Sequence, residues 1–214
     1  MKNYSKTIFA AAAMTFALAA NAGVVTVTSN TAYDVENFDG DLEIAKFVAP
    51  AGTFLTSVKF ELFNTLSGSI DVSNDGPTSG TFTVTAGGQI DGDILGSVLS
   101  TSGSITKNFT LAGGDTGSVT LAPWTVSNSL TLSSPAALAA FTGPGTYHAL
   151  LTGWSTASSS GTGNATYDPV VYMDGYAKVT YTYETAPVPE PETYAMLLGG
   201  LALMGVVARR RKSA

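Results

Sequence analysis

The sequence predicts an all-β fold, a single antiparallel β-sandwich of the jelly-roll or immunoglobulin-like kind. Three observations predict it. Apolar and polar residues alternate with a period of two along many short segments, as they do in strands with one buried face. Clusters of Gly, Asn, Asp and Pro separate these segments at short intervals, which is typical of a sandwich. Charged residues make up only 12% of the 214 residues, while the hydrophobic share is an ordinary 44%.

The segment from Thr56 to Leu62 shows the strand pattern most clearly. Apolar side chains at 58, 60 and 62 alternate there with polar side chains at 57, 59 and 61. The same alternation predicts strands at 24–28, 43–48, 56–62, 68–72, 81–85, 104–111, 118–126, 130–132, 146–152 and 176–183. Thr and Ser on the solvent side of these strands favour an extended backbone without adding charge, which accounts for the low charged fraction.

Turn residues and one short helix complete the predicted domain. Helix is expected only from Pro135 to Phe141, where Ser134 is placed to cap the first turn and Pro occupies its first position. Turn signals lie at 39–40, 74–77, 86–88, 112–115 and 143–145. We therefore expect nine or ten short strands joined by tight turns.

The N-terminal segment has the three parts of a secretory signal peptide. Lys2 and Lys6 precede an apolar run, and Ala20 and Ala22 supply the small residues of an A-x-A cleavage site, so the mature chain is expected to begin at Gly23. The alternative is a buried N-terminal helix. The run is apolar all round and stops at the small residues, which favours the signal peptide.

The C-terminal segment predicts a short transmembrane helix. The stretch 194–208 carries no charge and is followed by four consecutive cations, Arg209, Arg210, Arg211 and Lys212. Fifteen helical residues reach about 22 Å, short of the roughly 30 Å hydrocarbon core, so the helix spans marginally. The cations place the C-terminus in the cytoplasm and the rest of the chain outside. The alternative is a core helix of a soluble domain.

A proline-rich linker precedes this apolar stretch. Val188, Pro189, Glu190 and Pro191, the apolar stretch and the terminal cations together resemble the PEP-CTERM sorting signal of Gram-negative bacteria. The resemblance implies processing by an exosortase, a membrane-embedded cysteine-type enzyme, and export from the inner membrane to the cell exterior, often alongside exopolysaccharide. The predicted organisation is signal peptide 1–22, ectodomain 23–185, linker 186–193, transmembrane helix 194–208 and basic tail 209–214.

Segments of the ectodomain carry a second resemblance. Phe47 and the residues 52–58, 141–146 and 179–183 look like the choice-of-anchor type E ectodomain, a β-rich exported domain joined to interchangeable anchors. Strand and turn residues carry this resemblance, so it implies a fold and a sorting route and transfers no active site.

The charge balance of the ectodomain excludes several classes of partner. Residues 23–188 contain four lysines, no arginine and fourteen acidic residues, a net charge of −10. Nucleic acids and anionic lipids are therefore excluded as partners, while neutral glycans and cations are favoured. The chain has no cysteine, which excludes disulfides and thiol catalysis.

Candidates for chemistry are few, and the sequence predicts no catalytic, cofactor-binding or metal site. His148, the only histidine, is interpreted as a polar residue on a strand face, because no G-x-S-x-G elbow accompanies it. Calcium ligation stays open at three acidic segments, 34–43, 71–76 and 91–93, although turn-forming Asx residues explain them better.

The sequence therefore predicts a structural or adhesive protein of the cell surface or the biofilm matrix, with no enzymatic activity. A carbohydrate-binding module and a secreted polysaccharide-active enzyme are the alternatives. Trp124 and Trp154 are expected in the core, although exposed rings would suit sugar stacking and extracellular polysaccharide as a partner. Paired carboxylates in a groove would favour the enzyme instead.

Overall fold

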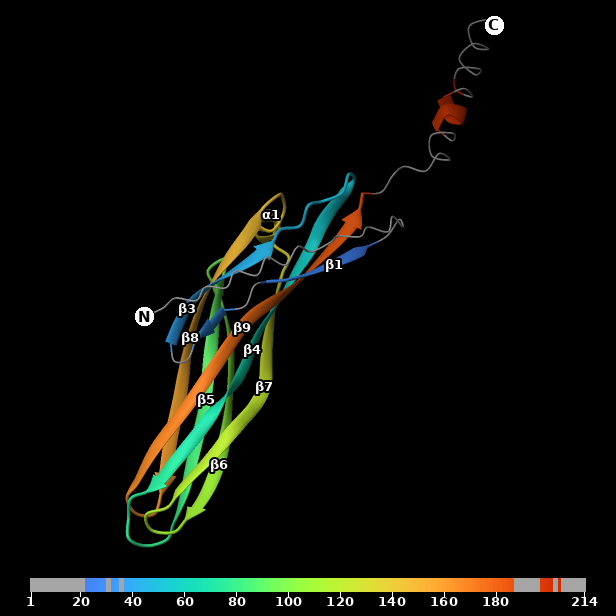
Figure 1. Ribbon diagram of the computed structural model, residues 1–214. Helices are drawn as coiled ribbons and strands as arrows, with labels where there is room; N and C mark the ends of the chain where they lie inside the picture. Colours follow the sequence, from blue (N-terminus) through green and yellow to red (C-terminus); the bar gives the residue numbers. More distant parts are fainter. Residues whose placement is uncertain (1–21, 30–31, 35–36, 187–196, 202–203, 205–214) are drawn as a thin grey trace, which may run out of the picture. The chain divides into compact units, whose positions relative to one another are not determined.

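The computed structural model describes residues 22–29, 32–34, 37–186, 197–201 and 204. The chain divides into two compact units, Met1–Glu184 and Thr185–Ala214. The elements, shown in Figure 1, are β1 (Gly23–Thr28), β2 (Ala32–Asp34), β3 (Asn37–Ala45), β4 (Thr53–Asn74), β5 (Gly80–Ile94), β6 (Ser97–Leu111), β7 (Thr116–Leu132), α1 (Pro135–Ala140), β8 (Thr146–Gly161) and β9 (Ala165–Thr185).

The strands form two antiparallel sheets, which confirms the predicted all-β sandwich. The five-stranded sheet has the order β1-β9-β4-β7, with β2 also pairing with β9. The four-stranded sheet has the order β3-β8-β5-β6. One cluster of buried side chains, drawn from both sheets, fills the space between them.

Alternation along β4 from Val58 onward builds one side of this core. Phe60, Leu62, Leu66 and Ile70 are fully buried, while Phe63 is only partly covered on the opposite side of the strand. Because a strand turns successive side chains to opposite faces, every second residue enters the core. The predicted period of two is therefore the pattern that the sheets use.

Tyr181 of β9 ties the five-stranded sheet to the end of β3 in the other sheet. Its side chain is fully buried, and its hydroxyl donates a hydrogen bond of 2.9 Å to the backbone oxygen of Ala45. Its ring lies 5.8 Å from that of Phe47 and 6.4 Å from that of Phe141. Burial raises the pKa of the Tyr181 hydroxyl, which keeps it neutral and able to donate.

The helix α1 begins where the sequence predicts. Ser134 is the N-cap: its backbone is extended, and its hydroxyl accepts a hydrogen bond of 3.3 Å from the Ala137 amide. Pro135 occupies the first helical position, which needs no amide donor. Phe141 is the C-cap of the helix and is fully buried, so the end of the helix also positions an aromatic ring in the core.

The strands are longer than predicted, and two predicted pairs of strands are each one strand. The segments 56–62 and 68–72 are both parts of β4, and 118–126 and 130–132 are both parts of β7. The strand predicted at 43–48 ends at Ala45, and Phe47 makes only an isolated bridge to Thr142. The small polar residues between the predicted segments continue the ladder and do not interrupt it.

The turn predicted at 86–88 is wrong, because these residues lie in the middle of β5. A side chain at Gly88 would collide with the sulfur of Met173 on β9, in the opposite sheet. Glycine at this position leaves room for the Met173 side chain of the facing sheet, and it does not mark a reversal of the chain. The turns predicted at 74–77, 112–115 and 143–145 are confirmed.

Asn74 organises two of these turns at one end of the sheets. Its side-chain nitrogen donates to the backbone oxygens of Thr78, Leu111 and Ala112 at 2.8 Å, 3.2 Å and 2.9 Å, and its side-chain oxygen accepts from the Gly76 amide at 3.1 Å. The residue is buried and satisfied on both side-chain atoms. One side chain thus links the end of β4, the start of β5 and the end of β6.

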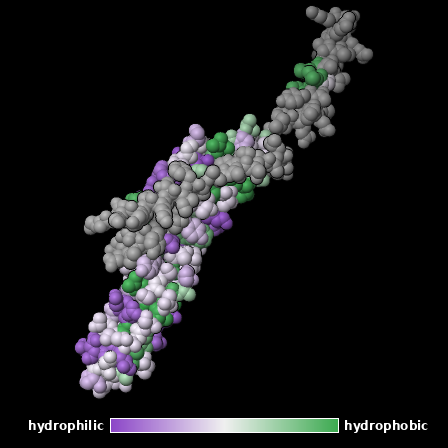
Figure 2. Space-filling model, viewed as in Figure 1, coloured by the Kyte–Doolittle hydropathy of each residue, from purple (hydrophilic) through white to green (hydrophobic). Residues whose placement is uncertain are grey.

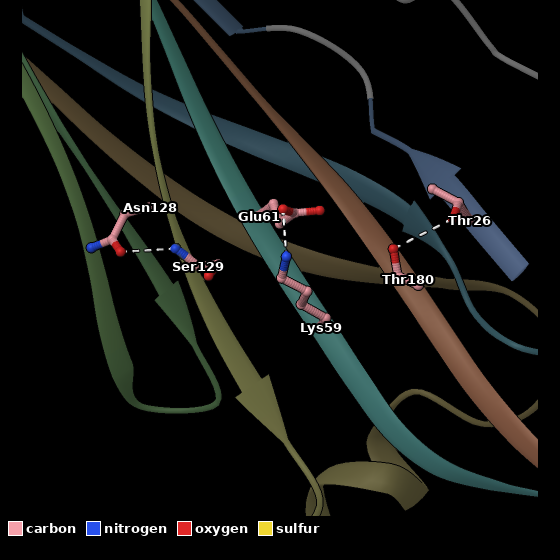
Figure 3. Close-up of polar contacts among 6 residues, drawn as sticks. All are labelled: Thr26, Lys59, Glu61, Asn128, Ser129 and Thr180. Carbon is pink, nitrogen blue, oxygen red and sulfur yellow. Dashed lines mark hydrogen bonds and ion pairs between the residues drawn. The ribbon is translucent and has the colours of Figure 1, made fainter. Parts of the chain in front are cut away.

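Hydroxyl pairs occupy the solvent faces of neighbouring strands. On the five-stranded sheet, the Thr65 and Thr125 hydroxyls lie 2.9 Å apart, and those of Thr26 and Thr180 lie 3.4 Å apart. Figure 3 shows the second pair together with the exposed ion pair of Lys59 and Glu61 on β4, at 2.7 Å. Hydrophilic and neutral residues cover most of the described surface in Figure 2. Uncharged polar side chains therefore form much of the described surface, as the sequence predicts.

Two buried asparagines on β4 should respond in opposite directions to replacement by leucine. Asn64 is fully buried, and neither its side-chain oxygen nor its nitrogen has a partner among the described residues. Asn64→Leu should raise the free energy of unfolding by about 1 to 3 kcal/mol, because it removes the desolvation cost of an unpaired polar group. Asn74→Leu should lower it by about 4 kcal/mol, at about 1 kcal/mol for each of the four lost bonds.

Urea unfolding monitored by circular dichroism measures both changes on the same strand. A loss of stability in Asn64→Leu comparable to that in Asn74→Leu would contradict the assignment of Asn64 as an unsatisfied core residue.

Candidate functional site

Five acidic residues of the domain lie together on the outer face of the four-stranded sheet. We call this surface the acidic face and define it by Asp39, Asp41, Glu43, Asp91 and Asp93. Phe38, Leu42 and Ile44 point into the core from β3, so the alternating acids between them point outward. In the sheet register Asp39 and Asp91 both flank Thr152 of β8, and Asp41 and Asp93 both flank Leu150. Five carboxylates therefore lie on either side of the first part of β8.

The strand positions of these acids correct the interpretation of segments 34–43 and 91–93 as turns. Residues 37–45 form β3, and Asp91 to Asp93 lie within β5. Asp and Asn favour turns by their local hydrogen bonding. Here the apolar residues that alternate with the acids are buried in the core, and their burial stabilises the strand instead. The exception is the Asp93 carboxylate, which accepts a bond of 2.7 Å from the Gly96 amide in the turn that follows β5.

His148 lies beside the acids of β3 and is hydrogen-bonded on both ring nitrogens. Its Nδ1 is 2.6 Å from Oδ2 of Asp41, and its Nε2 is 3.1 Å from the hydroxyl of Thr146. Glu43 is the residue directly opposite His148 in the ladder between β3 and β8. The His148 and Asp41 side chains are 54% and 53% exposed, which confirms the prediction of a histidine on a strand face.

The order carboxylate, imidazole, hydroxyl is the order found in a nucleophile with its base and orienting acid. In an active site, fixed protein dipoles stabilise the charge that develops in the transition state. Here His148 and Asp41 are about half exposed on a sheet surface, so water would solvate that charge instead. The same three side chains have a second chemical capacity. Ligand atoms of Asp41, Glu43 and His148 lie within 4.8 Å of one another, so these residues could together hold a metal ion.

Two further carboxylates of the acidic face are engaged by neutral donors. The Asp39 carboxylate accepts from the Thr152 hydroxyl at 3.3 Å, and the Asp91 carboxylate accepts from the Gln89 amide at 2.9 Å. These bonds hold the carboxylates in place without neutralising them, so the acidic face keeps its negative charge.

In the segment 71–76, residues 71–74 end β4, and a hydrogen-bonded turn around Asp75 follows. Its two carboxylate oxygens accept from the hydroxyls of Thr166 and Ser73 at 2.7 Å and 2.8 Å. These two bonds, that of Thr166 first, lower the pKa of Asp75 below its ordinary value of 3.8. The turn interpretation therefore accounts for Asp75, whereas Asp71 is a strand residue of β4.

An aromatic pair on the outer face of the five-stranded sheet escaped the sequence analysis. The rings of Phe63 and Tyr176 are stacked 4.8 Å apart with an angle of 5° between their planes. Asp174 precedes Tyr176 by two residues on the same side of β9, and burial raises the pKa of its carboxyl. Only the pairing of β4 with β9 brings these residues together, and sequence spacing contains no signal of it.

The two tryptophans lie in different environments. Trp124 packs against the core, as predicted, but Trp154 points away from the core on the outer face of the four-stranded sheet. Gly153 beside it faces inward and lies against the ring of Phe38. In the register Trp154 lies between Asn37 of β3 and Gln89 of β5. The core prediction is therefore wrong for Trp154.

Most of the predicted sorting residues lie outside the described residues. This holds for Ala20, for 188–191 and for the cations 209–212. Gly23, the expected first residue of the mature chain, is also the first residue of β1. Residues 197–201 and 204 are helical, but among the residues that the structure describes no helix is long and apolar enough to cross a membrane.

Comparison with known proteins identifies the C-terminal segment. Residues 187–212 match the PEP-CTERM protein-sorting motif, which supports the chain as an exosortase substrate with a membrane-anchored precursor and an extracellular destination. The motif spans a small part of the chain and leaves the β domain unassigned. No curated protein matches the chain.

Solved structures with some likeness to the chain are viral proteins. The VP2 subviral particle of infectious bursal disease virus has a TM-score of 0.25 at 12% identity, over 89% of this chain and 49% of that chain. The Gt strain of the same virus gives 0.22 at 14% identity, over 86% and 47%. A mud crab tombus-like virus gives 0.19 at 10% identity, over 92% and 96%. The chain spans about half the length of the first two, and at these TM-scores the likeness carries no argument.

The carboxylate of Asp75 should make stability depend on pH in the acid range. Because its folded pKa lies below 3.8, its contribution is present above that pH and is lost as the pH falls through the lower folded value. Asp75→Asn should therefore be less stable than the parent near neutral pH, and the difference should shrink below pH 3.8. Thermal unfolding from about pH 6 to about pH 2 measures this.

Asp71→Asn is the matched control, since Asp71 is an exposed acid on the neighbouring strand β4. A difference for Asp75→Asn that is constant across this pH range would show that the carboxylate charge is not responsible.

Proposed function

We propose that the protein is an exported structural or adhesive component of the cell surface or extracellular matrix, which an exosortase processes at its C-terminal motif. The observation that carries the proposal is the match of residues 187–212 to the sorting motif. The role itself requires no catalysis.

The rest of the sorting route is part of the same proposal. A signal peptide ending at Ala22 opens the route, and the apolar stretch 194–208 holds the precursor in the inner membrane until the exosortase acts. Of the ten cations of the chain, two lie in the signal peptide and four directly follow the apolar stretch. Their concentration there is what a topology signal requires, and it leaves the exported domain strongly acidic.

The form of the domain supports a mechanical or scaffolding role. β4 has 22 residues and β9 has 21. A strand of this length extends about 70 Å at roughly 3.3 Å per residue. Threonine pairs lie on the outer faces of both sheets. The domain contains no cysteine that oxidation outside the cell would modify. The resemblance to choice-of-anchor type E ectodomains agrees with such a role.

Replacing the centre of the motif should block C-terminal processing. Pro189→Ala/Glu190→Ala should leave the full-length precursor in the membrane fraction, because the exosortase no longer recognises it. Fractionation of cells that contain an exosortase, followed by intact mass measurement, reports both location and cleavage.

Pro187→Ala/Glu192→Ala is the matched control, with the same residue types changed just outside the tripeptide Pro189-Glu190-Pro191. Processing of the first variant at the rate of the parent chain would refute sorting through this motif.

Carbohydrate binding is the second candidate function, and the outward position of Trp154 favours it. An aromatic ring on a sheet face offers a flat apolar surface to the face of a sugar ring. The Gln89 amide and the Asp91 carboxylate, bonded to each other at 2.9 Å, lie beside it on β5 and supply polar groups of the kind that sugar hydroxyls need. Matrix polysaccharide is the partner that this surface would suit.

Trp154→Ala should weaken binding to its glycan by at least about tenfold, the effect of losing roughly 1.4 kcal/mol of ring contact. A glycan array identifies the ligand, and titration calorimetry then compares the variants. Phe63→Ala is the matched control, because it removes an aromatic ring from the outer face of the other sheet. Glycan binding that is equal in the parent chain and in Trp154→Ala would exclude this site.

A further inference from the structure

His148 on the acidic face has two carboxylates of β3 as neighbours. Asp41 is hydrogen-bonded to it, and Glu43 is its partner in the ladder. Asp41 and Glu43 are two residues apart on β3 and project from the same side of the strand. His148 is the ladder partner of Glu43, and its Nδ1 already approaches Asp41 to 2.6 Å. Three possible ligands thus stand on two paired strands, whose register fixes their spacing.

The spacing suits a small divalent ion. Zinc bonds to nitrogen and oxygen of about 2.0 to 2.2 Å place tetrahedral ligand atoms roughly 3.4 Å apart. The ligand atoms of the three residues lie within 4.8 Å of one another, with the Asp41 and His148 atoms closer than 3.4 Å. A small separation of that pair and a rotation of the longer Glu43 side chain bring all three to bonding distance, with no change of the backbone.

Thr146 gives the histidine the second partner that a metal-bound imidazole needs. When Nδ1 binds a metal, Nε2 carries the proton, and a group that accepts this proton fixes the tautomer and the ring orientation. The Thr146 hydroxyl lies 3.1 Å from Nε2 and is in the position to accept it. The orientation of the ring is thus set by the strand on which it stands.

The surrounding charge adds to the attraction for a cation. Asp39, Asp91 and Asp93 lie on the same face, and His148 is the only side chain in this group that can carry positive charge. Two ligating carboxylates neutralise a divalent ion, and the three further acids raise its local concentration.

We propose that Asp41, Glu43 and His148 form a binding site for a divalent transition-metal ion of the zinc class. The imidazole nitrogen selects such an ion over calcium and magnesium, which prefer oxygen ligands alone. The protein supplies three ligands from a half-exposed surface, and water completes the coordination on the outer side. The site is separate from the sorting motif and does not depend on the proposed function.

Titration calorimetry of the purified, tag-free full-length chain with zinc chloride tests the site. One zinc ion should bind per chain, and calcium chloride should bind at least about tenfold more weakly, since calcium gains little from imidazole. His148→Ala and Asp41→Asn should each weaken zinc binding at least about tenfold, and Thr146→Val, which removes only the orienting hydroxyl, should weaken it by about tenfold.

Asp71→Asn, an exposed acid on the other sheet, is the control and should leave the zinc affinity unchanged. Circular dichroism without metal establishes that each variant is folded, which we expect because the replaced side chains face outward. Absence of heat at millimolar zinc would overturn the site. So would zinc binding that His148→Ala leaves unaltered, which would indicate diffuse attraction to the acidic face.

Discussion

The register of the strand ladders is the constraint on which the rest of the molecule depends. Each long strand gives alternate side chains to the core and to water, so a shift by one residue would exchange the two sets. Such a slip in β4 would expose Phe60 and Leu62 and bury Lys59 and Glu61. The long ladder between β4 and β7 and the Asn74 bonds at the end of β4 oppose that shift. The same register determines which side chains lie next to one another on the outer surfaces, including the acidic face.

Much of the fold could be predicted because local patterns decide it. Alternation within Thr56 to Leu62 and the cap at Ser134 are both properties of a few adjacent residues, and both are confirmed. Glycine was the main source of error. In sequence, a pair such as Gly87 and Gly88 has the same appearance whether the chain turns or another backbone or side chain comes close, and only the facing sheet distinguishes the two cases.

The candidate site was less predictable, since its parts come from distant segments. Asp41, Glu43 and His148 were each noted in the sequence, but nothing in their spacing shows that Glu43 and His148 are opposite each other in the ladder. Trp154 was assigned to the core on general preference, although its neighbour Gly153 is the residue that faces inward. Pairing between strands is a long-range property, so the groups that meet on a sheet surface emerge only with the tertiary structure.

The position of β9 has a consequence for the order in which the domain can assemble. It is the last strand in sequence, yet it lies inside the five-stranded sheet, between β1 and β4. A chain that emerges with its N-terminus first therefore holds β1 without its partner until residues 178–183 have appeared. The four-stranded sheet, whose latest strand is β8, is complete earlier. The core can therefore close only after β9 has emerged. This strand directly precedes the segment that carries the sorting motif.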